Sequence, residues 1–445
     1  MAEWKPTKIE RFLKERAGRY APEDNAVKDL KRLNKIDFSG EIHLSDKDSK
    51  TDMIIIEPGD LVISGINVSK GALAVYHGNE PITATIHYSS YIFDEDKINI
   101  EYFKRFLKSK SFVNALKEQV KGGIKTEIKS KHFLPLEINL PDIDAQKDIV
   151  SFFSRIENEM AELNDAINQQ QDYLRRIRRK ILQEAIEGKL TAEWRKKNPK
   201  LISSDNHASK LLEKIKAEKE RLIKEGKIKK EKPLAPIADA EKPFSLPEGW
   251  VWCRLGEICD FITKGTTPAV NELKREGDIP YLKVYNIIDQ KIDFNYRQQY
   301  ISRKIHHQLL RSKVFPGDVL MNIVGPPLGK VAIIPYDFQE WNINQALAIF
   351  RCTVKKVNAF IYLFLIEGSA IKAIQTLGVV GQDNISLTQC REIMFPLPSL
   401  AEQQAIVERV NEIMAMIDEL EKQVTERKDK SERLMQSVLR EASTQ

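Results

Sequence analysis

The sequence of 445 residues contains one pattern twice, at a distance of more than half its length. Glu57-Pro-Gly-Asp-Leu-Val-Ile63 is echoed by Phe315-Pro-Gly-Asp-Val-Leu-Met321, and the two prolines stand 258 positions apart. Further matches follow in the same order, with offsets between 252 and 258: 30–37 with 282–289, Gly71 with Gly329, Leu107 with Leu365, Leu140-Pro141 with Leu397-Pro398, and Gln146 with Gln403. Such an ordered series predicts two copies of one folding unit.

Both copies have the same internal order of patterns. Short β-branched or aromatic runs come first, and Pro-Gly-Asp and single glycines separate them, which is typical of strands joined by tight turns. In the Pro-Gly-Asp turn, proline fixes φ and glycine takes the positive φ. A helical pattern follows at about 100–120 in the first copy and at 357–376 in the second. We therefore expect an α+β fold, with two repeated α/β heads that each precede a long helix.

The long helices show the most regular apolar pattern. A series of positions in steps of four and three runs from Ile149 to Ile181, and again from Ile406 to Val438, 257 positions later. Its residues are apolar except for Gln170 in the first helix and Arg427 and Ser431 in the second. A sustained 3.5-residue repeat predicts a coiled-coil seam, whereas a helix that packs only on its own head would show a broader stripe. The predicted seam consists of Ile149, Phe153, Ile156, Met160, Leu163, Ile167, Leu174, Ile177, Ile181, Ile406, Val410, Ile413, Ile417, Leu420, Val424, Leu434 and Val438.

These patterns predict a plan of head, helix, linker, head and helix. The predicted bounds are 1–140 for the first head, 141–188 for its helix, 189–244 for a basic, partly helical and proline-rich linker, 245–397 for the second head and 398–442 for the second helix. About 40 residues at a rise of 1.5 Å each give a rod of roughly 60 Å. The linker is long enough for parallel or antiparallel pairing of the helices, so the residues alone leave both open.

Composition excludes several classes of protein. A hydrophobic share of 42% excludes general disorder, and the longest apolar run, Phe360–Ile366, is far too short to span a membrane. The N-terminus carries no apolar signal core, so we expect a cytoplasmic protein. Four cysteines, none in a CxxC pair, predict neither a disulfide framework nor a zinc site. The net charge of +6 permits a polyanionic partner, and basic residues gather at 102–132 and 175–180.

Catalytic motifs are missing. Asn322–Lys330 contains Gly-Pro-Pro-Leu-Gly-Lys, which is one residue short of a phosphate loop and lacks the sequence expected of an amino-methyltransferase motif. Glu127-Ile-Lys129 has the form of a nuclease motif, but no acidic partner stands at the right place before it. The histidine doublet His306-His307 is not part of an HExxH motif. We therefore expect a binding protein with no catalytic residues and no metal site.

At this point the residues resemble a known family. The start of the second long helix, Pro396-Leu-Pro-Ser-Leu-Ala-Glu-Gln-Gln-Ala-Ile-Val407, is similar to a helix start in the specificity (S) subunits of type I restriction-modification enzymes. Leu140–Val150 is a weaker version of the same motif, and Gly188-Lys-Leu-Thr-Ala-Glu-Trp-Arg195 resembles the segment that closes the first long helix in this family. Together with the half-length repeat, the resemblance covers nearly the whole chain.

The resemblance implies a division of labour. Each head would be a target recognition domain for one half of an asymmetric, bipartite double-stranded DNA sequence, and the two helices would pair as an antiparallel coiled coil that sets the spacing. Two adenine methyltransferase subunits and two ATP-dependent motor-nuclease subunits would dock on this chain in a host-defence complex. The chain itself would be non-catalytic and bind no cofactor, because S-adenosylmethionine, ATP and Mg belong to the partners.

DNA contacts require amide, guanidinium or hydroxyl groups at base edges and basic groups at phosphates. Two pairs of candidates occupy matched positions in the repeat, Asn34 with Asn286 and His87 with Asn344. In the first head the candidates are Lys31, Arg32, Asn34, Ser64, Asn67, Lys70, His87, Lys125 and Lys129. In the second head they are Lys264, Thr266, Lys283, Tyr285, Asn286, Arg297, Asn322, Lys330, Asn344, Gln345, Gln382 and Asn384.

Two other functions stay open at this stage. A stand-alone two-headed DNA-binding or bridging protein would use the same heads without a methyltransferase, and it would bind its target when purified alone. An enzyme of an unrecognised type would bind S-adenosylmethionine or a nucleotide as the isolated chain.

Overall fold

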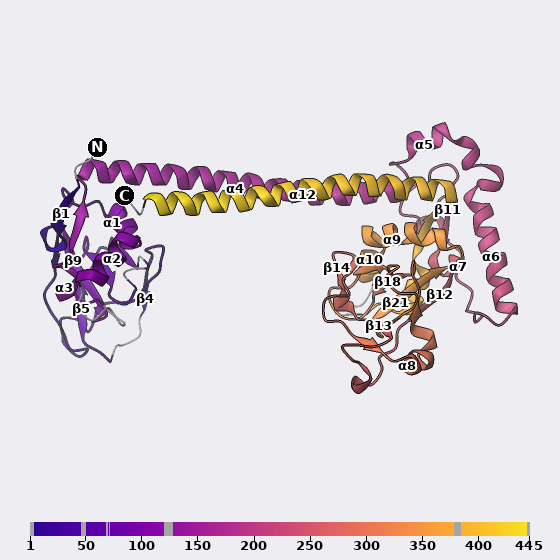
Figure 1. The fold of residues 1–445 in the computed structure, drawn as a ribbon, viewed down its shortest axis with the longest axis horizontal. Helices are drawn as coiled ribbons and strands as arrows, with labels where there is room; N and C mark the ends of the chain where they lie inside the picture. The colour runs from indigo at the N-terminus through magenta and orange to yellow at the C-terminus, as the bar shows by residue number, and fades with distance from the viewer. Residues whose placement is uncertain are drawn as a thin grey trace. The chain divides into compact units, whose positions relative to one another are not determined.

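The computed structural model describes residues 4–45, 50–67, 70, 72–119, 128–377 and 384–442. It divides into two compact units, one formed by residues 1–169 and 424–445 and the other by residues 170–423. Each unit contains one head and parts of both long helices (Figure 1). Among the described residues, no helix combines the length and apolar character needed to cross a membrane.

The first head contains two four-stranded sheets and one two-stranded pair. The sheet orders are β2-β9-β6-β7 and β4-β3-β8-β5, and β1 pairs with β10. The strands are β1 (Lys5–Lys8), β2 (Leu13–Glu15), β3 (Arg32–Ile36), β4 (Ile42–Ser45), β5 (Met53–Ile56), β6 (Leu61–Ser64), β7 (Leu73–Val75), β8 (Ile82–Thr85), β9 (Tyr88–Phe93) and β10 (Glu137–Leu140). The helices are α1 (Ile100–Leu107), α2 (Lys110–Gln119) and α3 (Ser130–Phe133).

The second head repeats this topology. Its sheet orders are β12-β21-β18-β19 and β16-β13-β20-β17, β11 pairs with β22, and the pair β14-β15 is additional. The strands are β11 (Val251–Arg254), β12 (Cys259–Lys264), β13 (Ile279–Leu282), β14 (Ile287–Ile288), β15 (Lys291–Ile292), β16 (Tyr300–Ile301), β17 (Lys313–Val314), β18 (Val319–Asn322), β19 (Val331–Ile333), β20 (Trp341–Ile343), β21 (Leu347–Cys352) and β22 (Met394–Leu397). The helices are α7 (Leu255–Ile258), α8 (Arg303–Gln308), α9 (Asn358–Glu367), α10 (Ser369–Leu377) and α11 (Leu387–Glu392).

The strand order therefore confirms the repeat. The Pro-Gly-Asp sequence recurs in both copies because contacts among its own residues form the turn. Gly59 and Gly317 have φ values of +89° and +88°, in the left-handed region that glycine tolerates. The aspartate that follows is buried in both heads. Asp60 accepts the backbone N–H of Glu57 at 3.1 Å, and Asp318 accepts that of Phe315 at 2.8 Å. Each turn is thus closed by its own aspartate, directly before a central strand.

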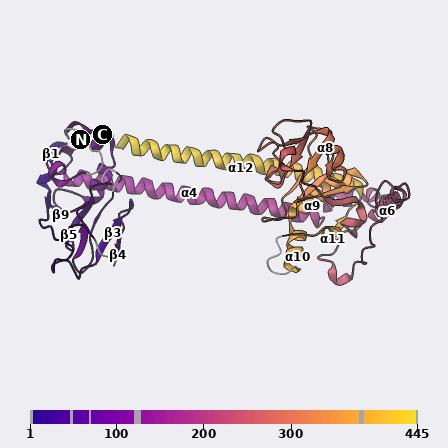
Figure 2. The same cartoon turned by 90° about the horizontal axis from the view of Figure 1, so that it is seen from below.

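The long helices are α4 (Ile143–Ile186) and α12 (Leu400–Ala442), and they lie side by side in both views (Figures 1 and 2). In the second unit their contacts run in opposite directions along the chain. Arg178 of α4 contacts Met414 and Glu421, and Arg195, beyond the end of α4, contacts Glu402. The helices therefore pair as an antiparallel coiled coil, as expected.

The buried row of this coiled coil is narrower than the sequence predicts. On each helix every seventh residue is buried, and those residues are Phe153, Met160, Ile167 and Leu174 on α4 and Val410, Ile417, Val424 and Ser431 on α12. The half-buried neighbours lie four positions after each of them, and most of these neighbours are polar: Glu157, Asn164, Gln171 and Arg178 on α4, and Met414, Glu421, Lys428 and Met435 on α12. The contact between the helices therefore consists of the buried row, which is mostly apolar, and of the half-buried positions beside it, which are mostly polar.

Four predicted seam residues are therefore not in the seam. The exposed fractions of Leu163, Ile177, Leu420 and Leu434 are 45%, 47%, 47% and 58%. The four residues lie three positions after residues of the buried row, whereas the half-buried contact positions lie four positions after them. Three and four residues turn the helix to opposite sides of the buried row, so these four side chains point away from the contact. Ile156 and Ile413 lie on that same side and are half-buried. The remaining predicted residues pack against the heads: Ile149 in the first unit, and Ile181 and Ile406 in the second. The side chain of Val438 lies outside the description.

The predicted linker is partly helical, and it packs against the second head. It contains α5 (Ala192–Lys197) and α6 (Ala208–Lys224), and Ala208, Leu211 and Ile215 join the core of the second head. Lys219 donates to the backbone oxygens of Gly256 and Cys259 at 2.5 and 2.6 Å. The charged segment therefore packs by one apolar side while its charges form local ion pairs, such as Arg221 with Glu218.

Candidate nucleic-acid interface

In the second head, the ends of four strands meet at one edge. Backbone hydrogen bonds join Asn344 N–H to Leu282 O at 3.0 Å, Gly265 N–H to Leu347 O at 3.0 Å, and Ile323 N–H to Ala346 O at 2.9 Å. The loops that follow β12, β13, β18 and β20 therefore lie together. This arrangement brings together five of the predicted DNA-contacting residues, namely Lys264, Thr266, Lys283, Asn344 and Gln345, and all five are exposed or half-buried.

Asn322 shapes this edge from within. It is buried, and its amide donates to Val324 O at 3.4 Å and Gly325 O at 3.2 Å while its Oδ1 accepts Gly329 N–H at 3.0 Å. Its hydrogen-bonding groups are used to hold the loop before β19, so it positions that loop instead of facing a ligand. The loop ends at half-buried Lys330, and exposed Asn384 pairs with Val324 across an isolated bridge.

Asn286 has the same role in a second loop. It is buried, its amide donates to Asp293 O at 3.2 Å and Tyr296 O at 2.8 Å, and its Oδ1 accepts Lys283 N–H at 3.0 Å. The neighbouring candidates Tyr285 and Arg297 reach the surface, where the Tyr285 hydroxyl donates to Arg297 O at 3.3 Å. Burial raises the pKa of Tyr285. Tyr296 joins them and was not predicted, because nothing in the sequence distinguishes it from other surface tyrosines.

The first head presents a corresponding edge. Gly65 donates its N–H to His87 O and accepts that of Ile128, both at 2.9 Å, just as Ile323 is linked to Ala346 and Ile385 in the second head. The edge carries the half-buried candidate Asn67 and the exposed candidates Lys70, His87 and Lys129. Ser64 is buried below it.

The remaining candidates of the first head lie on β3. Asn34 is exposed on this strand, whereas Lys31 and half-buried Arg32 lie at its start. Strand pairing also corrects the matched positions of the repeat. Arg32 pairs with Thr83 as Tyr281 pairs with Asn342, so Asn34 corresponds to Lys283 and not to Asn286. His87 accepts the N–H of Gly65 as Ala346 accepts that of Ile323, so His87 corresponds to Ala346 and not to Asn344. Lys125 and Gln382 fall outside the described residues.

Two arginines near these sheets are committed to internal ion pairs. Arg16 donates through Nε and Nη2 to Asp60 at 2.6 and 2.7 Å, and Ser90 donates to the same carboxylate at 2.6 Å. Burial favours the protonated acid, but these hydrogen bonds outweigh it and lower the pKa of Asp60. Arg351 holds Asp318 at 2.9 and 2.6 Å in the second head. These arginines stabilise the scaffold beneath the two edges.

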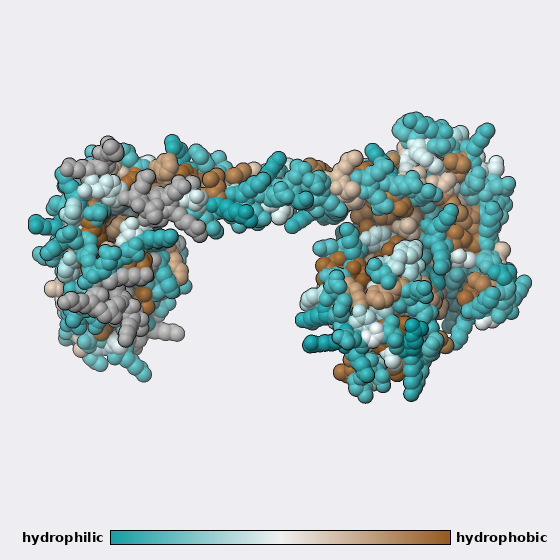
Figure 3. Space-filling model, viewed as in Figure 1, coloured by the Kyte–Doolittle hydropathy of each residue, from teal (hydrophilic) through white to brown (hydrophobic). Residues whose placement is uncertain are grey.

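A second candidate surface lies along the helices. Residues three and four positions after a buried residue flank it on opposite sides, because each residue turns the helix by 100°. In an antiparallel pair, the same flank of both helices lies on the same face. In the second unit one face is polar and carries Arg178 with Asp418 and Glu421. The opposite face carries half-buried Ile413 and exposes Tyr173, Ile177, Met416 and Leu420, and we call it the apolar face. Apolar surface along the paired helices is visible in Figure 3.

A buried polar cluster that the sequence did not predict fixes the start of α12. Glu402 is fully buried, and its carboxylate accepts hydrogen bonds from Trp250 Nε1 at 2.8 Å, Thr191 Oγ1 at 2.7 Å and the Arg195 guanidinium. Arg195 also donates to Gly188 O at 2.6 Å. The signal was present, because Gly188–Arg195 and 396–407 are the two motifs that carry the family resemblance. What the sequence does not show is that they contact each other.

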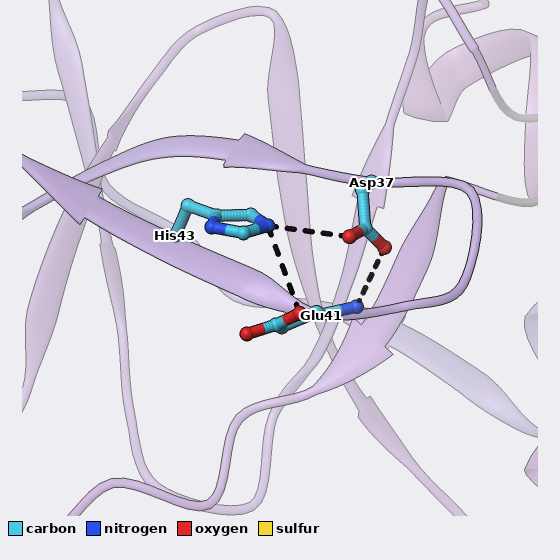
Figure 4. Close-up of side chains that lie close together, drawn as sticks. All are labelled: Asp37, Glu41 and His43. Carbon is cyan, nitrogen blue, oxygen red and sulfur yellow. Dashed lines mark hydrogen bonds and ion pairs between the residues drawn. The ribbon is translucent and has the colours of Figure 1, made fainter. Parts of the chain in front are cut away.

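The described residues contain one cluster with the geometry of a metal site, Asp37, Glu41 and His43 (Figure 4). His43 Nε2 lies 3.2 Å from Asp37 and 4.0 Å from Glu41. However, Asp37 closes the β3–β4 turn by accepting the N–H groups of Ser39, Gly40 and Glu41. Hydrogen bonds from Ser39, Glu41 and His43 lower the pKa of Asp37. The turn explains the cluster, and we assign no metal to it.

Comparison with known proteins identifies the family. The model of the type I restriction modification DNA specificity domain matches residues 22–170 and 247–427. The EcoEI specificity subunit of Escherichia coli is 31% identical over 252 residues, which cover 55% of this chain and 41% of that protein. For the EcoAI specificity subunit of the same species the identity is 32% over 254 residues, covering 55% and 40%. The matched segment thus spans about two fifths of these relatives.

Two solved structures share the fold over almost the full length. A chain from a study of assembly and conformational transition of the type I R-M system has a TM-score of 0.62 at 17% identity, covering 99% of this chain and 97% of that one. The HsdS subunit from Thermoanaerobacter tengcongensis has a TM-score of 0.53 at 17% identity, with 99% and 96% covered. Since the family model covers both heads and most of both helices, this chain belongs to the type I restriction modification DNA specificity domain family.

Proposed function

We propose that this chain is the non-catalytic DNA recognition subunit of a type I restriction-modification complex. Each head reads one half of an asymmetric bipartite target through its loop edge, and the coiled coil fixes the number of base pairs between the halves. The observation that carries this proposal is that two heads of identical strand order, both matched by the specificity-domain model, present different side chains at the same edge.

The difference between the edges supports an asymmetric target. The first edge offers Asn67, His87 and Lys129, whereas the second offers Lys264, Asn344 and Gln345. Base readout depends on which donors and acceptors reach the groove, so these two sets recognise different base pairs. The lysines supply phosphate contacts, which fix orientation without specifying sequence.

The apolar face supports docking of partner subunits on the helices. Its exposed side chains in the second unit include Tyr173 at 59%, Met416 at 63% and Leu420 at 47%. In the first unit, Leu163 and Leu434 occupy the corresponding flank and are also exposed. Helices bury such a stripe against partner helices with a matching apolar row. We assign this surface to the adenine methyltransferase subunits. S-adenosylmethionine, ATP and Mg would be bound by the methyltransferase and motor-nuclease subunits.

The test is to map methylated adenines across the genome of the native host, with and without this gene. We expect a motif of two short defined blocks around a fixed gap, which disappears on deletion and returns on complementation. An unchanged methylation pattern, while the partner genes are expressed, would contradict the proposal. Specific DNA binding by the chain purified alone would then favour the stand-alone two-headed binder.

A further inference from the structure

The loop around Arg297 combines four features that distinguish it from the rest of the second edge. Arg297 has a φ of +53°, which is uncommon for a residue with a side chain. Its guanidinium carbon lies 5.2 Å from the centre of the Tyr296 ring and 5.8 Å from that of Tyr285. The two rings meet edge to face at 6.0 Å. The arginine is therefore presented on an aromatic platform at the surface.

This platform is held rigidly from below. The buried Asn286 amide binds the carbonyl oxygens of Asp293 and Tyr296. Asp293 in turn accepts the N–H groups of Asn295 and Tyr296 at 3.0 and 3.3 Å. Backbone strain of this kind persists where the surroundings over-determine the conformation, and such positions cluster at functional sites.

The guanidinium is available for a ligand. Within the part of the chain that the structure describes, no carboxylate pairs with it, whereas Arg16 and Arg351 are each held by a buried aspartate. Lys283 lies beside the same platform, with Nζ 6.0 Å from the centre of the Tyr285 ring. Lys283 follows Leu282, whose carbonyl binds Asn344, so the platform is continuous with the loop edge.

We propose that Arg297 reads a guanine in one half of the DNA target, with Tyr285 and Tyr296 as positioning residues. This inference rests on the proposed function and names a residue that sets specificity at one base pair. A planar guanidinium fixed in orientation suits the bidentate contact to guanine O6 and N7 in the major groove. A phosphate contact has no need of such a platform, because a mobile lysine provides it. Lys283 is placed to make the phosphate contact next to that guanine.

The test compares three variants in the native host by mapping methylated adenines. Arg297→Lys keeps the charge and loses the fork, and Arg297→Gly removes the side chain at a backbone conformation that glycine favours, so folding is preserved. Arg303→Lys is the matched control, because Arg303 begins α8 in the same head and its side chain is 75% exposed.

We expect both Arg297 variants to lose preference at one G·C pair of one block, by about 10- to 100-fold, while the other block stays unchanged. The control should keep the wild-type motif. A uniform loss of methylation at all sites without a change of preference, or an unchanged motif, overturns the inference. If the wild-type gene itself directs no motif, the proposed function fails, and this inference fails with it.

Discussion

The two heads have the same scaffold and different edges. Both use a buried aspartate after the Pro-Gly turn, and in both a buried glutamine, Gln146 or Gln403, binds the carbonyl of the proline that precedes the long helix. However, the arginine that pairs with the aspartate comes from just after β2 in the first head and from β21 in the second. Both scaffolds thus contain the same arginine–aspartate pair, although the arginine comes from a different position in each head. The loop residues are not part of this pair and can therefore differ between the heads.

The largest difference between the units concerns the start of the long helices. Glu402 has Ala145 as its counterpart 257 positions earlier, so only the second unit has the buried carboxylate among Thr191, Arg195 and Trp250. We expect Glu402→Ala to lower the free energy of unfolding by about 3–5 kcal/mol, because the partly buried guanidinium loses its partner. Chemical denaturation of the complex-free chain measures this change.

The counterpart position provides the control. Ala145→Ser should change the free energy of unfolding by less than about 0.5 kcal/mol, since Ala145 is half-buried and near the start of α4. A loss below about 1 kcal/mol in Glu402→Ala would show that the cluster does not stabilise the fold.

The second prediction separates the observed seam from the one that the sequence predicts. Leu174 is 8% exposed and Ile177 is 47% exposed, on the same helix and one turn apart. Leu174→Ala should cost about 2–4 kcal/mol of stability, and Ile177→Ala less than about 1 kcal/mol. Thermal unfolding of both variants tests this. Equal losses would restore the sequence-based seam. Weaker binding of the proposed methyltransferase partner to Ile177→Ala would support the apolar face as its docking surface.

The sequence alone predicted the repeat, the two heads and the two long helices, because these depend on periodicity and local turns. It did not predict which side of each helix faces the other helix. Leu163 and Leu174 both belong to rows that repeat every seven residues, and only the position of the partner helix decides which row is buried. Nor did it show that Asn286 and Asn322 face inward, since an amide that holds a loop and one that reads a base look alike in a sequence. Long-range contacts, such as Glu402 with Trp250, require the fold.

A third prediction concerns how the stability of the first head depends on pH. The pKa of Asp60 is lower in the folded chain than its ordinary value of 3.8, so its contribution to stability is present above that pH and is lost as the pH falls through the folded-state pKa. Asp60→Asn should be about 1.5–3 kcal/mol less stable than the wild type at pH 7. The gap should narrow below about pH 4. The exposed Asp172→Asn, measured alongside by urea unfolding, should show almost no gap at either pH.

The smallest expected effect has the opposite sign and compares the two copies at one position of the coiled coil. Ser431 lies 257 positions after Leu174 and is likewise in the buried row, with an exposed fraction of 3%. Within the described part of the chain its hydroxyl has no hydrogen-bond partner. A buried hydroxyl without a partner destabilises the fold, and alanine also favours a helix more than serine does.

Ser431→Ala should therefore raise the free energy of unfolding by about 0.5–1 kcal/mol, whereas Leu174→Ala lowers it. The two variants introduce the same residue at equivalent positions, so any difference between them comes from what each side chain contributes to the row. If Ser431→Ala were destabilising by more than about 1 kcal/mol, the hydroxyl would be making a contact that specifies how the helices pair, as buried polar groups do in other coiled coils.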